Sequence, residues 1–98
     1  MHGNTSAWLY VGDHGVPIDL RCGIDLTVAT QLSIDVRKPD GTAVVWAAAV
    51  HELTSLRYTL QPGDLDASGT WRLQAHVVAP GSDRRGATAI LTVRPRYG

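Results

Sequence analysis

The sequence predicts an all-β fold, an antiparallel β-sandwich of about seven strands. Short stretches in which apolar and polar residues alternate recur along the chain, and turn-forming Gly, Pro and Asp residues separate them. No stretch keeps the 3.6-residue apolar period of an amphipathic helix, and no internal repeat is visible. With 98 residues, the chain has the length of one small domain, residues 1–98.

The most informative stretch runs from Gly63 to Ala75. Its Asp and Ser side chains can bond the nearby backbone, and Gly69 tolerates positive φ, so it begins as a turn. It continues as a strand in which Trp71 and Leu73 alternate with polar residues. We therefore expect a corner that leads into a central strand, with Trp71 as the main core residue.

The same alternation places the other strands. They are expected at residues 7–11, 16–22, 31–38, 43–50, 56–60, 70–78 and 87–93. The first two should form a hairpin. Residues 79–86 are expected to be a mobile polar loop, and residues 1–6 and 95–98 flexible arms.

A turn at Pro39-Asp40-Gly41 should join the third and fourth strands. Proline fixes φ, aspartate can form a side-chain bond to the backbone, and glycine tolerates positive φ. The alanine run Ala47-Ala48-Ala49 suits a helix by propensity, but it is short and lacks caps. The preceding turn favours a hairpin strand.

The composition narrows the classes of partner. Nine basic and nine acidic residues give a formal charge of zero, whereas nucleic-acid and anionic-membrane binders are normally basic. We therefore expect neither direct nucleic-acid binding nor membrane binding. Cys22 is the single cysteine, so no internal disulfide is possible, and it is expected to be a small buried hydrophobic residue.

No set of residues predicts catalysis, a cofactor or a metal site. Asp64 and Asp66 are the closest acidic pair, but the oxygen ligands of a calcium loop do not follow them, so turn capping is expected. The histidines do not have metal-binding spacing; they are His2, His14, His51 and His76. A nucleophile elbow is also missing, so the protein is expected not to be an enzyme.

Six residues are candidates for an interface: Trp8, Tyr10, Arg84, Arg85, Ile90 and Tyr97. The aromatic residues near the chain ends suit an interface, whereas Trp46 and Trp71 suit the core. The adjacent arginines can bind an acidic group, and the alternative is a plain solvated loop. Ile90 interrupts an outward polar pattern.

Three segments carry a family resemblance: Leu9 to Asp13, Val36 to Thr42 leading to Trp46, and Gly63 to Ala75. In order and spacing they resemble an immunoglobulin-like β-sandwich of tailed-phage and prophage virion proteins. The chain is similar to the N-terminal domain of siphophage baseplate upper proteins over about residues 8–94. The shared motifs are turn and core motifs.

The resemblance implies a non-enzymatic structural protein located in the virion. It would act through contacts with other virion proteins, in multiple copies. A baseplate upper protein continues into a receptor-anchoring region where this chain ends, which favours a capsid decoration, connector or tail accessory protein. The alternative is a carbohydrate- or receptor-binding adhesion module of the same fold, using exposed Trp8 or Tyr10.

Overall fold

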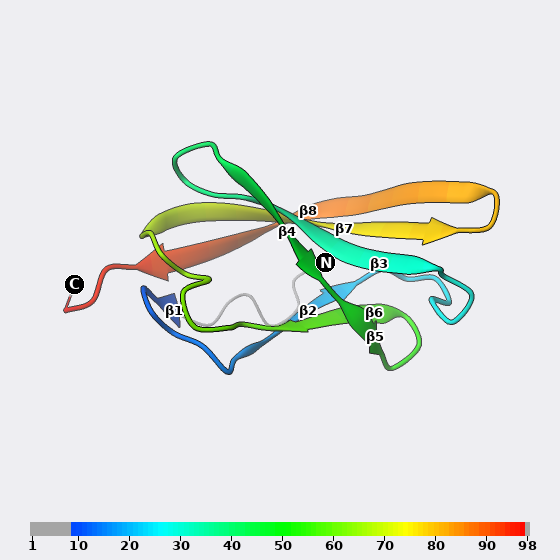
Figure 1. The fold of residues 1–98 in the computed structure, drawn as a ribbon, viewed down its shortest axis with the longest axis horizontal. Helices are drawn as coiled ribbons and strands as arrows, with labels where there is room; N and C mark the ends of the chain where they lie inside the picture. Colours follow the sequence, from blue (N-terminus) through cyan, green and yellow to red (C-terminus); the bar gives the residue numbers. More distant parts are fainter. Residues whose placement is uncertain (1–8, 98) are drawn as a thin grey trace.

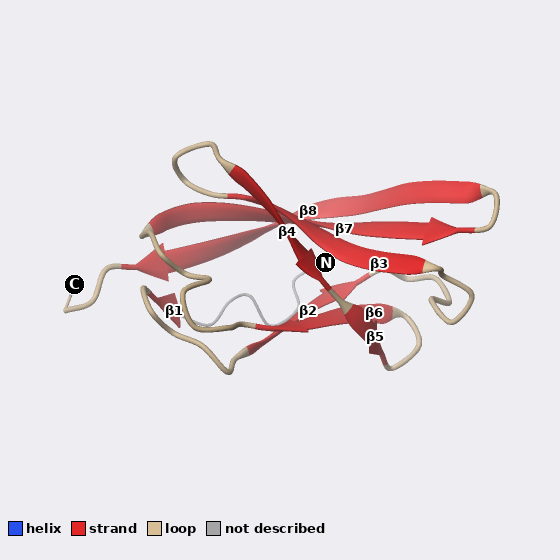
Figure 2. Cartoon of the chain, in the orientation of Figure 1, coloured by secondary structure: helices blue, strands red, loops and turns tan. Residues whose placement is uncertain are grey.

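A computed structural model describes residues 9–97, and the regular structure of this part is entirely β (Figures 1 and 2). The strands are β1 (Leu9–Tyr10), β2 (Pro17–Arg21), β3 (Gln31–Arg37), β4 (Ala43–Ala47), β5 (Ala49–His51), β6 (Ser55–Thr59), β7 (Gly69–Ala79) and β8 (Ser82–Arg94). Among these residues, no helix has the length and apolar character to span a membrane.

The strands form two layers, which Figure 1 shows one above the other. The larger sheet has the order β1-β8-β7-β3-β4, and the smaller sheet has the order β2-β6-β5. Every pairing is antiparallel except that of β1 with β8. The predicted immunoglobulin-like β-sandwich is therefore confirmed.

The core lies between the two sheets, as the alternation of apolar residues predicts. Trp71 is fully buried, and its indole Nε1 donates a hydrogen bond to the Ala67 carbonyl oxygen at 3.0 Å. Because that bond satisfies the indole N–H, the whole ring can be buried without cost to a polar group. The other fully buried large side chains come from both layers: Ile18, Leu20, Leu26, Ile34, Val36, Leu56, Leu60, Leu65, Leu73, Leu91 and Val93.

The strand predicted at residues 43–50 is two strands in the structure. The chain leaves the larger sheet after β4 and joins the smaller sheet as β5. Ala48 lies between them and donates its N–H to the Leu32 carbonyl oxygen at 3.1 Å. The alanine run is therefore extended chain that changes sheets, and the helical alternative is wrong.

The predicted hairpin of the first two strands is wrong. Leu9 and Tyr10 pair in parallel with the end of β8, whereas β2 pairs with β6 in the other sheet. Gly12 and Gly15, at φ of 93° and 73°, reverse the chain between them. Their turn carries the chain across the sandwich instead of back along the same sheet, and local sequence does not distinguish these two outcomes.

The mobile loop predicted at residues 79–86 is also wrong. β7 continues to Ala79 and β8 begins at Ser82, so only Pro80 and Gly81 make the turn. A β-bulge between Gln74 and His76 shifts the register of this hairpin. The polar sequence of this segment reflects strands exposed to solvent, because polarity reports exposure and not irregular backbone.

The predicted Pro39-Asp40-Gly41 turn is confirmed. The Lys38 N–H donates to the Thr42 carbonyl oxygen at 2.8 Å, and an Asp40 carboxylate oxygen accepts the Thr42 N–H at 3.0 Å. Gly41 has a φ of 90°, which glycine adopts without steric penalty.

Cys22 is half-buried beside the core, and burial raises the pKa of its thiol.

Gly69 should be the glycine least tolerant of substitution, because its φ is 128° and a Cβ would lie 2.9 Å from two Pro39 ring carbons. Gly63 is a matched control, since its φ is 87° but a Cβ there meets nothing within 4 Å. We expect Gly63→Ala to lower the free energy of unfolding by about 1 kcal/mol and Gly69→Ala by about 3 kcal/mol. Urea denaturation measures both losses, and equal losses would contradict this role of Pro39.

Candidate functional site

Strand β4 is one of the two edge strands of the larger sheet, and hydrogen bonds at its two ends define how it pairs with β3. Before β4, the Lys38 N–H donates to the Thr42 carbonyl oxygen at 2.8 Å. After β4, the Ala48 N–H donates to the Leu32 carbonyl oxygen at 3.1 Å. In an antiparallel pair, residues alternate between facing the partner strand and facing away from it. The backbone of every second residue from Thr42 to Ala48 therefore faces β3.

The remaining backbone groups of β4 face away from the sheet. They belong to Ala43, Val45 and Ala47, which lie opposite Arg37, Asp35 and Ser33 of β3 in non-hydrogen-bonded pairs. In the part of the chain that the structure describes, no strand pairs with this side of β4. We call these N–H and C=O groups the β4 edge. An edge of this kind can accept another extended chain.

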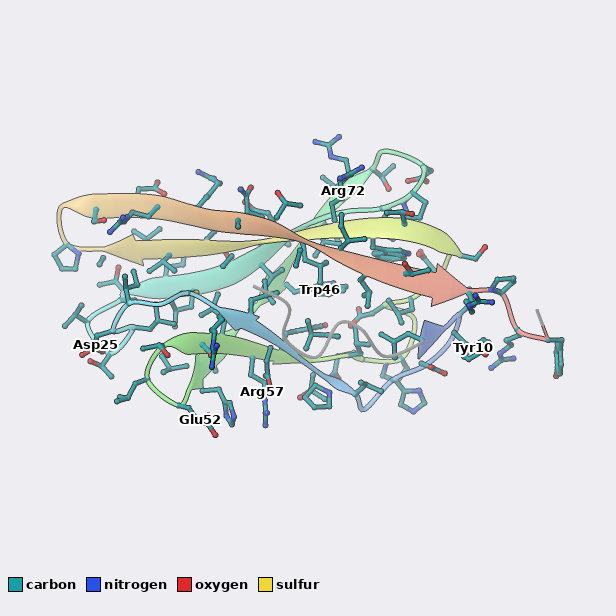
Figure 3. The ribbon with its side chains drawn as sticks, turned by 180° about the vertical axis from the view of Figure 1, so that it is seen from behind. Tyr10, Asp25, Trp46, Glu52, Arg57 and Arg72 are labelled. Atoms are coloured by element: carbon teal, nitrogen blue, oxygen red, sulfur yellow. The ribbon has the colours of Figure 1, made fainter. Side chains whose placement is uncertain are left out.

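The β4 edge opens onto a groove of about 430 Å³ between β4 and the chain that follows β6. Residues Val44 to Ala47 line one side, and Tyr58, Gly63 and Asp64 line the other. The rings of Trp46 and Tyr58 stack in this region with centroids 4.8 Å apart and planes inclined by 13°. Figure 3 shows Trp46 between the two layers. We call this space the edge groove.

Asp64 organises the far side of the edge groove. One of its carboxylate oxygens accepts the Tyr58 hydroxyl and the Gln61 N–H, the latter at 2.7 Å. Partial burial and the hydrogen bond to the Asp64 carboxylate raise the pKa of the Tyr58 hydroxyl to about 12. The predicted turn-capping role is confirmed for Asp64, while Asp66 forms an ion pair with Lys38 at 2.9 Å.

A second groove, of about 380 Å³, lies on the outer face of the larger sheet and shares β4 as a wall. Its lining includes Ala43 to Val45, Asp35 and Arg37 from β3, and Arg72 from β7. Val45 leaves 66% of its surface exposed here. Figure 3 shows Arg72 on the outer side of this sheet. We call this space the outer groove.

Charged side chains on the same face form a network around the hairpin of β7 and β8. Arg85 bonds Asp35 at 3.1 Å and lies 3.9 Å from Asp83. Asp83 also contacts His76 Nε2 at 2.6 Å. Asp35, the acidic residue that lines the outer groove, is therefore already paired.

The six predicted interface residues do not form one site. Trp8 lies outside the described residues. Tyr10 in β1 and Tyr97 near the C-terminus are exposed at the end of the sandwich away from the hairpin that holds Arg84 and Arg85 (Figure 1). Ile90 is 44% exposed and lies opposite Arg72, so it borders the arginine of the outer groove.

The β4 edge is not among the features that the sequence predicts. Its signal is a strand without charge or proline, Ala43-Val44-Val45-Trp46-Ala47. That signal becomes informative only when β4 is known to be outermost.

For metal binding, the described residues contain no group of three or more His, Cys, Asp or Glu side chains placed to hold an ion.

Comparison with known proteins gives a likeness of fold. No protein-family model matches the chain, and no curated protein matches it. A solved structure that it resembles is CopC from Methylosinus trichosporium OB3b, with a TM-score of 0.61 and 17% sequence identity. The match covers 91% of this chain and 83% of the CopC chain.

This comparison corrects the expected role in a tailed-phage particle. The fold matches that of a CopC protein, and no family model or curated protein supports a phage role. The role was inferred from turn and core motifs, which encode the sandwich and not what its surface binds. The family resemblance, the virion partners and the virion location stay predictions.

Trp46 is buried, like Trp71, so neither indole offers an exposed platform for a sugar.

Amide hydrogen exchange should show the alternation along β4. We expect the Val44 and Trp46 amides to exchange at least about tenfold more slowly than those of Ala43, Val45 and Ala47, because only the former bond to β3. Nuclear magnetic resonance resolves exchange at each residue. Uniform protection along β4 would mean that its outer side is already covered.

Alkaline titration should weaken the fold through Tyr58. A tyrosine in the unfolded chain ionises near pH 10, whereas the folded pKa is about 12, so its contribution to stability is complete below about pH 10 and is lost as the pH rises towards 12. Tyr58→Phe should remove this component of the pH dependence. Asp64→Asn should lower the Tyr58 pKa, which absorbance titration measures. An unchanged pKa in that variant would contradict the role of Asp64.

Proposed function

We propose that the protein is a non-enzymatic protein-binding module that captures an extended segment of a partner protein along β4. The observation that carries this proposal is the β4 edge, where the backbone groups of Ala43, Val45 and Ala47 face a groove instead of another strand. A captured segment would add a strand to the larger sheet. Main-chain hydrogen bonds then provide affinity, and alternate side chains provide specificity.

The other outer strands are less suited to this role. β1 has two residues and β5 has three, so each offers few backbone groups. β2 begins with Pro17, which has no N–H to donate, and it carries charges at Asp19 and Arg21. Charges, proline and short length are the devices that protect an edge from pairing. β4 has five residues, and none of them is charged or a proline.

The side-chain chemistry of the two grooves favours binding over catalysis. The edge groove combines apolar residues of β4 with an aspartate that holds Tyr58 and a backbone N–H. In the outer groove, Asp35 is held by Arg85. The Tyr58 hydroxyl does donate to the Asp64 carboxylate, but its pKa is raised to about 12, whereas an activated nucleophile needs a lowered pKa or a base free to take its proton.

Copper binding is not carried over from the structural likeness. CopC is a copper-binding protein, but at 17% identity the likeness shows the fold alone. Within residues 9–97, the side chains that could ligate a metal do not gather in groups of three or more. The residues that the structure describes therefore do not fit such a site.

Val45→Pro tests the proposal sharply. Proline removes the one N–H at the centre of the β4 edge, and that N–H makes no bond to β3, so the sheet is retained. Val45→Thr is the matched control, since it keeps the N–H and the branched shape. Random peptides of about twelve residues, displayed and selected on the wild-type protein, supply the probes.

We expect the selected peptides to protect the amides of Ala43, Val45 and Ala47 from exchange. Val45→Pro should weaken their binding by about tenfold or more, and Val45→Thr by less than about threefold. Thermal unfolding verifies that the proline variant is folded. Peptides that bind without protecting these amides would contradict the proposal. A free protein that forms dimers protecting the same amides would contradict it too, because the occupant would be a second copy.

A further inference from the structure

The outer face of the larger sheet places two arginines directly opposite each other. Arg37 of β3 pairs in register with Arg72 of β7, and both side chains are exposed and line the outer groove. Like charges opposite each other on neighbouring strands are destabilising. This pair therefore costs stability unless an anion binds beside it.

The fold itself does not supply that anion. Among residues 9–97, none of the ion pairs involves Arg37 or Arg72. Asp35, which lies on the same strand face, is held by Arg85 at 3.1 Å. The hydrogen bond of the Arg37 side chain runs from Nη1 to the Gly41 carbonyl oxygen at 3.0 Å, so this guanidinium leans towards the turn between β3 and β4.

This turn is next to the place where a captured strand would lie. Ala43 stands between Arg37 and the β4 edge, since it pairs with Arg37 across β3 and β4. Its side chain is a single methyl group, so nothing larger separates Arg37 from an added strand. Two strand spacings are about 10 Å, a distance that arginine and glutamate side chains can bridge together.

We propose that the segment captured by β4 carries an acidic side chain on its outward face, opposite Ala43, and that Arg37 binds its carboxylate. This inference rests on the proposed function. Arg72 stands beside Arg37 and adds positive potential without direct contact. The expected partner sequence therefore alternates apolar residues with polar residues that include glutamate. A second copy of this chain would instead present Ala43, Val45 and Ala47, which carry no acid.

The test uses three synthetic peptides of about eight residues in which valine alternates with glutamate, glutamine or lysine. Calorimetry compares their affinities for the full chain at low and high salt. We expect the glutamate peptide to bind about tenfold more tightly than the glutamine peptide, and the lysine peptide to bind most weakly. Salt should reduce the advantage of glutamate.

Variants assign the preference to the outer groove. Arg37→Gln should remove the preference for glutamate over glutamine, and Arg72→Gln should reduce it. Arg21→Gln is the matched control, because Arg21 is exposed on β2 in the other sheet and loses the same charge. Amide exchange at Ala43, Val45 and Ala47 reports edge binding independently of charge.

The outcomes separate the two proposals. Equal binding of the glutamate and glutamine peptides, with protected edge amides, would overturn the acidic preference and leave strand capture standing. Failure of all three peptides to protect those amides, together with selected peptides that bind without protecting them, would overturn both. Competition by free acetate at millimolar concentration, as effective as the peptide itself, would assign the arginines to a free anion and overturn the acidic-segment inference.

Discussion

The column of aromatic rings that joins the two sheets is the interaction on which the rest of the structure depends. Trp71 of β7 stacks with Trp46 of β4 at a centroid distance of 6.4 Å, and Trp46 stacks with Tyr58 of β6 at 4.8 Å. Lys38 lies over the Trp71 ring at 5.7 Å. Each aromatic side chain removes about 150–250 Å² from water when buried. The column therefore contacts the central strand, the edge strand and the second layer together.

This arrangement explains how β4 remains in place with one side unpaired. Alternate residues have separate tasks: Val44 and Trp46 point into the sandwich, while Val45 points outward and is 66% exposed. The same alternation applies to the backbone, because the residues that bond β3 are not those that face the edge groove. Stability thus comes from one set of groups, and the proposed strand capture would use the other, so the groups that face the edge groove can change without loss of the core.

The local sequence predicted where most strands lie, but it was a poor guide to which strands pair. The alternation of apolar and polar residues showed which side chains of β3 and β7 point to the core, and it identified Trp71 as buried. The side of a sheet to which a side chain points is a local property with a period of two residues. It misassigned the partner of β1, because pairing depends on contacts between distant residues. It also took the ends of β7 and β8 for a loop, because their polar residues report exposure to solvent and not irregular backbone. The β4 edge exists only once five strands are ordered, so it could not be predicted from the stretch that forms it.

The residues that define the fold differ from those on which the proposed partner binding depends. The segment Gly63 to Trp71 and the Pro39-Asp40-Gly41 turn specify a corner and a hairpin, which sandwiches with unrelated roles can share. Arg37 and Arg72 differ from these residues because both are exposed. Lysine, glutamine or threonine at either position would change stability little. Two arginines opposite each other repel one another, and within residues 9–97 neither has an ion pair to offset that repulsion. Under the proposal, a partner's carboxylate bound in the outer groove would offset this repulsion. The pair is therefore more informative about function than any core residue.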